Sequence, residues 1–170
     1  MTLTLQLVVL LGLSSGLWMG ANAKCPKKGD CCMVCPDGWM EHDSRCYMFH
    51  AGEKDWCDAE STCVAQGGNL VSIRKPEDAD FLRGKVQELT GEIKRLWLGG
   101  YKAHKETCWK WSDGSDITGF TSWGDGEPNN VDGIEHCMEL MHTDVQPIND
   151  APCDVLKGFF CARDLEMQQD

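Results

Sequence analysis

Five oxygen-bearing side chains gather in the second half of the chain, in a stretch punctuated by glycine and proline. They are Glu127, Asn129, Glu135, Asn149 and Asp150. Carboxylate and amide oxygens are the ligands of a hard cation, and Ca²⁺ takes about 6–8 of them. The set therefore predicts a Ca²⁺ site on a surface loop. An ion held there could also bind the hydroxyl groups of a sugar, which would make the protein a binding module and not an enzyme.

The first 23 residues have the pattern of a secretory signal. They carry no charged side chain, contain an apolar run over residues 3–13, and end in Ala21-Asn22-Ala23, which suits cleavage after Ala23. A membrane anchor would need about 20 apolar residues, but Gly12 breaks this run early. We therefore expect a secreted, extracellular chain without a membrane span.

All 11 cysteines follow this segment. Such a density in an exported chain predicts a disulfide framework. Because an odd number of cysteines cannot pair fully within one chain, at least one thiol is free or bonded to another chain. Cys32 and Cys35 have the spacing of half a zinc site, but no matching second pair exists, so disulfides are the better interpretation.

Charge and motifs exclude other function classes. The net charge is −11 and the sequence has no basic run, so we expect no nucleic-acid partner. Neither a GxSxG nor an HExxH motif occurs. No histidine follows Cys31-Cys32, where a small secreted phospholipase would need one. We therefore predict that the protein is not an enzyme.

Local patterns predict two helices. The first covers residues 53–66, where apolar side chains recur at helical spacing, and Gly67-Gly68 ends it. The second begins at Pro76, a residue that suits the first helical position, and ends at Gly91. Its predicted apolar face consists of Phe81, Leu82, Val86 and Leu89.

Strands are predicted around and after these helices. A turn at residues 42–44 precedes a strand at 46–49, and alternation predicts another strand over 70–73. Later strands are expected at residues 96–100, 108–111, 137–141 and 158–161. Residues 115–133 form a long polar loop, and such loops inside compact domains are usually functional.

Taken in order, these motifs resemble the C-type lectin domain. The motifs are WLGG at 97–100, WKWSDG at 109–114, EPN at 127–129 and FFCARD at 159–164. The resemblance implies an α+β fold of two helices, small antiparallel β-sheets and a long calcium-binding loop, rich in disulfides. The expected organisation is a signal peptide at 1–23, a cysteine-rich extension at 24–34, the lectin domain at 35–164 and a tail at 165–170.

The resemblance also implies three disulfides, which are Cys35–Cys46, Cys63–Cys161 and Cys137–Cys153. Five cysteines then remain, namely Cys25, Cys31, Cys32, Cys57 and Cys108. A Cys57–Cys108 bridge, or a bridge from either to the N-terminal cluster, stays open. We expect one N-terminal cysteine to link two chains into a homodimer, since paired sites raise avidity for arrayed glycans.

In the same family the five oxygen-bearing residues form the principal Ca²⁺ site, with the peptide bond before Pro128 in cis. Two adjacent sugar hydroxyls would each bind the ion, donate to a carboxylate and accept from an asparagine amide. The order Glu127 then Asn129 suits equatorial 3- and 4-hydroxyls, as in mannose, fucose, N-acetylglucosamine and glucose. The galactose-type version carries Gln-Pro-Asp instead.

The chain departs from the family pattern at a few positions. Ile148 stands where a core tryptophan is usual, and Gly100 changes the core strand. Asn130 and His136 occupy positions where an auxiliary calcium site needs acids, so we predict that this second site is weak or absent. Trp123 is expected in the core beneath the loop, not against a ligand.

The leading prediction is a secreted, calcium-dependent lectin of mannose-type specificity that acts in innate defence on microbial surfaces. The alternative is a type II antifreeze protein, which shares this fold. A third class, the venom-type domain that binds a protein, often loses calcium ligands, whereas all five are kept here. The retained Glu-Pro-Asn and the high charge favour sugar over ice, because ice-binding faces tend to be flatter and less charged.

Overall fold

The computed structural model describes residues 33–102, 108–118, 123–142 and 147–167. The predicted signal peptide and nearly all of the cysteine-rich extension lie outside these residues and stay predictions. From Met33 onward the chain forms one compact unit. Within the described part, no helix is long and apolar enough to cross a membrane.

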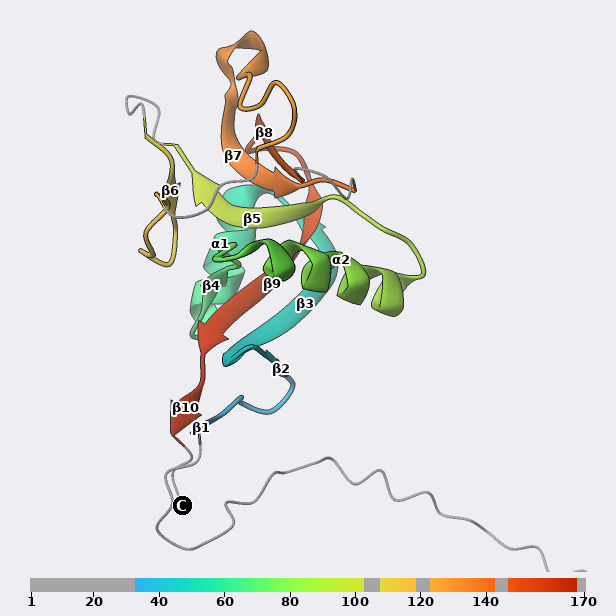
Figure 1. The fold of residues 1–170 in the computed structure, drawn as a ribbon, viewed down its shortest axis with the longest axis vertical. Helices are drawn as coiled ribbons and strands as arrows, with labels where there is room; N and C mark the ends of the chain where they lie inside the picture. Colours follow the sequence, from blue (N-terminus) through green and yellow to red (C-terminus); the bar gives the residue numbers. More distant parts are fainter. Residues whose placement is uncertain (1–32, 103–107, 119–122, 143–146, 168–170) are drawn as a thin grey trace, which may run out of the picture. The chain divides into compact units, whose positions relative to one another are not determined.

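Two α-helices and a set of short strands make up this unit (Figure 1). The helices are α1 (Trp56–Ala65) and α2 (Pro76–Thr90), and a 3-10 helix η1 covers Val131–Gly133. The strands are β1 (Met33–Val34), β2 (Met40–His42), β3 (Arg45–Lys54), β4 (Asn69–Leu70), β5 (Leu96–Tyr101), β6 (Lys110–Trp111), β7 (Glu135–Leu140), β8 (Ile148–Pro152), β9 (Lys157–Asp164) and β10 (Glu166–Met167).

The main sheet of the described residues has the strand order β2-β3-β9-β5-β7-β8, with β4 also paired to β9 and β6 to β5. Every pairing is antiparallel except β5 with β9. Strand β9 is buried over most of its length and joins the early strands to the later ones. The α+β fold class predicted from the sequence is confirmed.

A separate two-stranded ribbon pairs β1 with β10. Met33 lies opposite Met167, so residues expected to be an extension and a tail form a strand pair of their own. The ribbon lies at the end of the unit remote from β7 and β8 (Figure 1). The compact unit thus includes residues on both sides of the predicted lectin domain, and the domain limits of 35 and 164 stay a prediction.

Helix α1 begins later than predicted because β3 continues to Lys54. Asp55 then caps the helix, and its side chain accepts a hydrogen bond from the backbone N–H of Asp58 at 2.8 Å. The helix buries Trp56, Ala59 and Cys63 against the sheet. The short polar side chain at Asp55 thus decides where extended backbone turns into helix.

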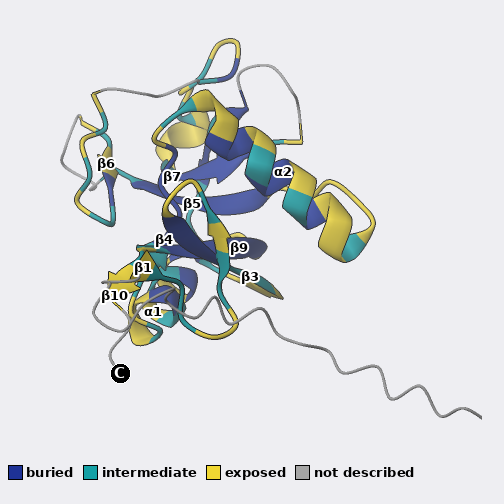
Figure 2. Ribbon diagram, turned by 60° about the horizontal axis from the view of Figure 1, so that its bottom comes forward, coloured by how far each residue is buried: buried dark blue, intermediate teal, exposed yellow. Residues whose placement is uncertain are grey.

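Helix α2 has the predicted limits. Pro76 starts it, and Gly91 ends it in the left-handed conformation at φ 81°. Leu82 and Val86 are fully buried, but Leu89, which was predicted to face the core, is half exposed. Residues 87–89 in the last turn are all exposed, and Figure 2 shows this end of α2 in the exposed colour.

The prediction of a strand over residues 70–73 is correct only at its start. Val71 and Ile73 are buried but lie outside any strand. The backbone N–H of Val71 donates to the carbonyl of Phe160 at 3.0 Å, and the carbonyl of Val71 accepts from Gly99 at 2.9 Å. Val71 thus makes one backbone hydrogen bond to β9 and one to β5, but residues 71–73 do not form a continuous ladder of strand hydrogen bonds.

The structure contains the three disulfides that the family resemblance implied, Cys35–Cys46, Cys63–Cys161 and Cys137–Cys153. The bridge between Cys63 and Cys161 joins α1 to β9 across a sequence separation of 98. Cys57 is exposed and pairs with no cysteine among the described residues, so a Cys57–Cys108 bridge is not formed. The N-terminal cysteines expected to link two chains lie outside the described residues.

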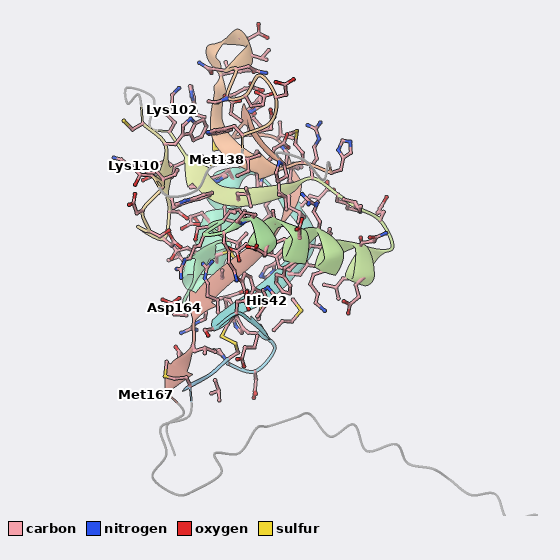
Figure 3. All side chains as sticks on the ribbon, viewed as in Figure 1. His42, Lys102, Lys110, Met138, Asp164 and Met167 are labelled. Carbon is pink, nitrogen blue, oxygen red and sulfur yellow. A yellow bond between two sulfur atoms is a disulfide. The ribbon has the colours of Figure 1, made fainter. Side chains whose placement is uncertain are left out.

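Gly100 on β5 makes room for Met138 on β7, which is fully buried and is labelled in Figure 3. A Cβ atom added at Gly100 would lie 2.0 Å from the sulfur of Met138 and 2.5 Å from its Cγ. The two strands can therefore stay paired around a methionine only because this position is glycine. The departure from the family pattern at Gly100 is explained by the size of its neighbour.

We predict that Gly100→Ala lowers the free energy of unfolding, because overpacking a core typically costs about 1–3 kcal/mol. The cost should shrink when Met138→Ala removes the obstructing side chain. Denaturant unfolding of the two single variants and the double variant measures this coupling. Gly84→Ala is the control, since nothing lies within 4 Å of the added atom. An equal cost of Gly100→Ala in both backgrounds would contradict the explanation.

Candidate functional site

The long polar loop is fixed to the sheet at its start. Trp123 forms a parallel bridge with Ile148 on β8, and the N–H of Gly124 donates to the carbonyl of Ile148 at 2.7 Å. Ile148 is fully buried in the core, so it does take the place of the usual tryptophan. Trp123 packs on that core and against Trp109, with ring centroids 5.0 Å apart, as the sequence predicted.

The Glu127–Pro128 peptide bond is cis, as the resemblance implied. The backbone N–H of Asn129 donates to Oε2 of Glu127 at 3.0 Å. The side-chain amide of Asn129 donates to Oε1 of the same carboxylate, also at 3.0 Å. The two side chains on either side of Pro128 therefore face each other and present an acceptor next to a donor.

Asp150 on β8 holds the backbone that follows Pro128 in place. Its carboxylate is fully buried and accepts hydrogen bonds from the backbone N–H groups of Asn129 at 3.1 Å and Asn130 at 2.9 Å. Asn130 has the left-handed conformation, with φ 47°, which asparagine tolerates better than most residues. A buried carboxylate thus orients two successive amides of the loop.

Glu135, the first residue of β7, closes the network from the other side. Its Oε2 atom accepts from the backbone N–H of Val131 at 2.8 Å, and its own N–H donates to Oδ1 of Asn130 at 3.1 Å. Val131 also donates to Oδ1 of Asn129 at 3.1 Å. The structure therefore brings four of the five predicted residues, Glu127, Asn129, Glu135 and Asp150, into one hydrogen-bonded network.

Asn149 joins this network through its neighbour and through β7. Its side-chain nitrogen donates to the backbone carbonyl of Asp150 and to Oε1 of Glu139, the latter at 2.9 Å. Asn149 and Glu139 are register partners on adjacent antiparallel strands, so their side chains share a face. With its amide hydrogens used inside the protein, Asn149 has its Oδ1 oxygen left to offer to a cation.

Glu139 is a residue that the sequence analysis missed. It is 1 % exposed and contacts two cations, Nη1 of Arg95 at 2.8 Å and Nζ of Lys157 at 3.4 Å. Lys157 in turn lies over the ring of Trp97, 3.7 Å from its centroid. The sequence does contain a signal for this residue, since Glu139 is a lone acid within the apolar run Cys137–Leu140. A charged side chain at such a position is buried only when it has a partner of opposite charge.

The electrostatics of the loop suit a cation. The pKa of Glu127 lies above its ordinary value, first because burial disfavours the charged form and also because Asp150 and Glu135 are close. The donation from the N–H of Asn129 opposes this shift. Within the described residues, no three His, Cys, Asp or Glu side chains form a ready-made metal cluster. The donor set of three carboxylates and two amide oxygens nevertheless fits Ca²⁺ by its chemistry.

Comparison with known proteins decides the family. Residues 52–163 match the model of the Lectin C-type domain. The chain belongs to the C-type lectin family. The relatives that the chain matches are lectins, and the family is not enzymatic, which confirms the prediction that the protein is not an enzyme.

This C-type lectin is similar to proteins with different ligands in their names. It is 37% identical over 164 residues to the galactose-specific lectin nattectin of Thalassophryne nattereri, covering 96% of each chain. It is 39% identical over 119 residues to ladderlectin of Oncorhynchus mykiss, covering 70% of this chain and 62% of that one. A solved calcium-independent type II antifreeze protein superposes with a TM-score of 0.70 at 27% identity, covering 79% and 98%.

We predict that Glu139→Ala destabilises this C-type lectin by about 3–5 kcal/mol, because it leaves Lys157 buried without its carboxylate. Glu88→Ala is the matched control. Glu88 contacts Lys85 at 2.7 Å on the exposed face of α2, and such a pair contributes about 0–1 kcal/mol. Unfolding in urea measures both variants. Equal, small losses would show that the Glu139 cluster is not a buried ion-pair network in solution.

Proposed function

We propose that the protein is a secreted, calcium-dependent lectin of mannose-type specificity. Ca²⁺ would be held by Glu127, Asn129, Glu135, Asn149 and Asp150, and the partners would be glycans with equatorial 3- and 4-hydroxyls. The observation that carries this proposal is the hydrogen-bonded network around the cis Glu127–Pro128 bond, which joins four of these residues. Recognition of microbial surfaces in innate defence is the setting that such specificity would serve.

The five side chains would make different contacts with the ion and with the sugar. When bound, Ca²⁺ supplies coordination to two sugar hydroxyl oxygens. The carboxylates of Glu127 and Glu135 accept hydrogen bonds from those hydroxyls, and the amide of Asn129 donates to one. Asn149 contributes its oxygen only, because its amide nitrogen donates to Glu139 and Asp150. Val131 and Ile134, both about half exposed, offer an apolar surface beside the loop for the C–H face of a sugar ring.

The order of acceptor and donor supports mannose-type over galactose-type recognition. Glu127 carries the acceptor and Asn129 the donor, and their facing atoms are 3.0 Å apart. The relative nattectin is named galactose-specific. The family resemblance implies that these two loop positions set the sugar preference, so overall identity to a galactose-specific protein does not decide it.

An exchange of the two side chains tests this directly. We expect Glu127→Gln with Asn129→Asp to shift preference from mannose towards galactose, since the substitutions reverse the positions of donor and acceptor. Competition with methyl mannoside and methyl galactoside in calcium measures the preference. Asp125→Asn, a change of charge on the same loop but outside the ligand set, is the control. An unchanged sugar profile in the double variant would mean that the loop is not the selector.

The second candidate function is ice binding, which the similarity to a type II antifreeze protein favours. A glycan array in calcium and in EDTA, run beside a thermal-hysteresis measurement, separates the two functions. We expect calcium-dependent binding to mannose-type glycans and no hysteresis. Hysteresis without glycan binding would replace the lectin proposal with the antifreeze one.

Calcium affinity should depend on pH through Glu127. A proton competes with Ca²⁺ for this carboxylate, and because its pKa is raised, the competition sets in at a higher pH than for an ordinary glutamate. Affinity should be full well above the raised pKa and should fall as the pH drops through it. Calcium titrations at several pH values test this, with Glu127→Gln as the variant that loses this part of the pH dependence. A variant with the same pH profile as the wild type would assign the effect to another group.

A further inference from the structure

A cavity of about 570 Å³ lies beside the proposed calcium site. Its walls come from β3, the segment between α2 and β5, the edge formed by β7 and β8, and the segment between β8 and β9. The volume falls within the range of about 300–1,000 Å³ that is usual for ligand pockets. The cavity is therefore large enough to take part of a ligand that extends from the loop.

The cavity and the calcium site share residues. Glu135 and Asn149 line the cavity and also belong to the predicted ligand set. At its base, Oε1 of Glu139 accepts from both Asn149 and Arg95, at 2.9 and 2.8 Å. The cavity therefore begins at two of the side chains proposed to hold the ion, so it lies next to the place where a coordinated sugar would bind.

The wall offers hydrogen-bond donors that a ligand can reach. Glu139 and Lys157 are buried and pair with each other, with Nζ of Lys157 3.4 Å from Oε2 of Glu139, so a ligand would not displace this pair. Lys94 and Arg95 line the same cavity with side chains that are about half exposed. A hydroxyl group that enters the cavity could accept a hydrogen bond from either of these two cations.

The charges and the rim indicate which ligand class fits. Four carboxylates line the cavity, from Glu53, Glu92, Glu135 and Glu139, against three cations, from Lys94, Arg95 and Lys157. Because these charges almost cancel, the wall selects neither an anion nor a cation, but it supplies both acceptors and donors. Val155 and Leu156 add an apolar rim with 42% and 59% exposure. Donors, acceptors and an apolar surface together suit a neutral, polyhydroxylated ring.

We infer that this cavity is a second saccharide subsite, which binds the neighbouring residue of a neutral oligosaccharide whose terminal sugar is held at the calcium site. The inference rests on the proposed lectin function. It turns a monosaccharide preference into a preference for a particular linkage, since only some linkages direct the second ring between Glu135 and Leu156.

Calorimetric titration of the full secreted chain in calcium tests the inference with monovalent ligands. The ligands are methyl α-mannoside and the α1-2, α1-3 and α1-6 mannobiosides. We expect at least one mannobioside to bind about tenfold more tightly than the monosaccharide, which is one decade in the dissociation constant. Leu156→Asp should abolish this gain and leave methyl α-mannoside binding unchanged. Val64→Asp, at a side chain with similar exposure outside the cavity, should keep the gain.

The outcomes separate the two proposals. Equal affinities for the monosaccharide and every mannobioside would overturn the subsite and leave the lectin function standing. A Leu156→Asp variant that weakens both ligands equally would also overturn it, because the residue would then act on the calcium site. Tighter binding of a sialylated disaccharide than of any neutral one would refute the assigned ligand class. Absence of calcium-dependent binding to all of these sugars would overturn both proposals.

Discussion

The antiparallel pairing of β7 with β8 is the interaction on which the candidate site depends. Glu135 projects from β7, whereas Asn149 and Asp150 project from β8, so these three members of the donor set keep their spacing only while the two strands stay in register. The Cys137–Cys153 disulfide braces this pair. Asp150 then transmits the position of β8 to the loop through two backbone hydrogen bonds. The position of the loop therefore depends on the strand pair β7 and β8, which is mostly buried.

Local signals in the sequence predicted much of the architecture because their physics is local. Pro76 and Gly91 set the ends of α2 by backbone conformation alone, and the Glu-Pro-Asn motif located the loop. Strand β8 was not predicted, since Ile148–Pro152 is short and contains the pair Asn149-Asp150 and a proline, residues typical of loops. They become a strand only by pairing with β7. Leu89 likewise has the spacing of the predicted apolar face of α2 but is half exposed, because helical spacing alone does not say which turns the rest of the fold covers.

The sequence predicted which residues would bind the cation, but it did not predict which residues hold these side chains in place. Glu139 lies outside the loop motif, and its role follows from a cross-strand register. That register turns the amide nitrogen of Asn149 towards the protein and so decides which atom faces the loop. The fold itself is compatible with a galactose-specific relative and with an antifreeze protein, so the ligand must be argued from individual side chains.

The ribbon of β1 and β10 has a consequence for how the protein can be presented. It brings Met33 and Met167 opposite each other, at the end of the unit remote from β7 and β8 (Figure 1). Coupling to a bead, a sensor surface or a fusion partner through either of these strands leaves the loop directed towards solution. Because the ribbon and the loop lie at opposite ends of the unit, several copies attached through their ribbons would present their loops towards one target surface.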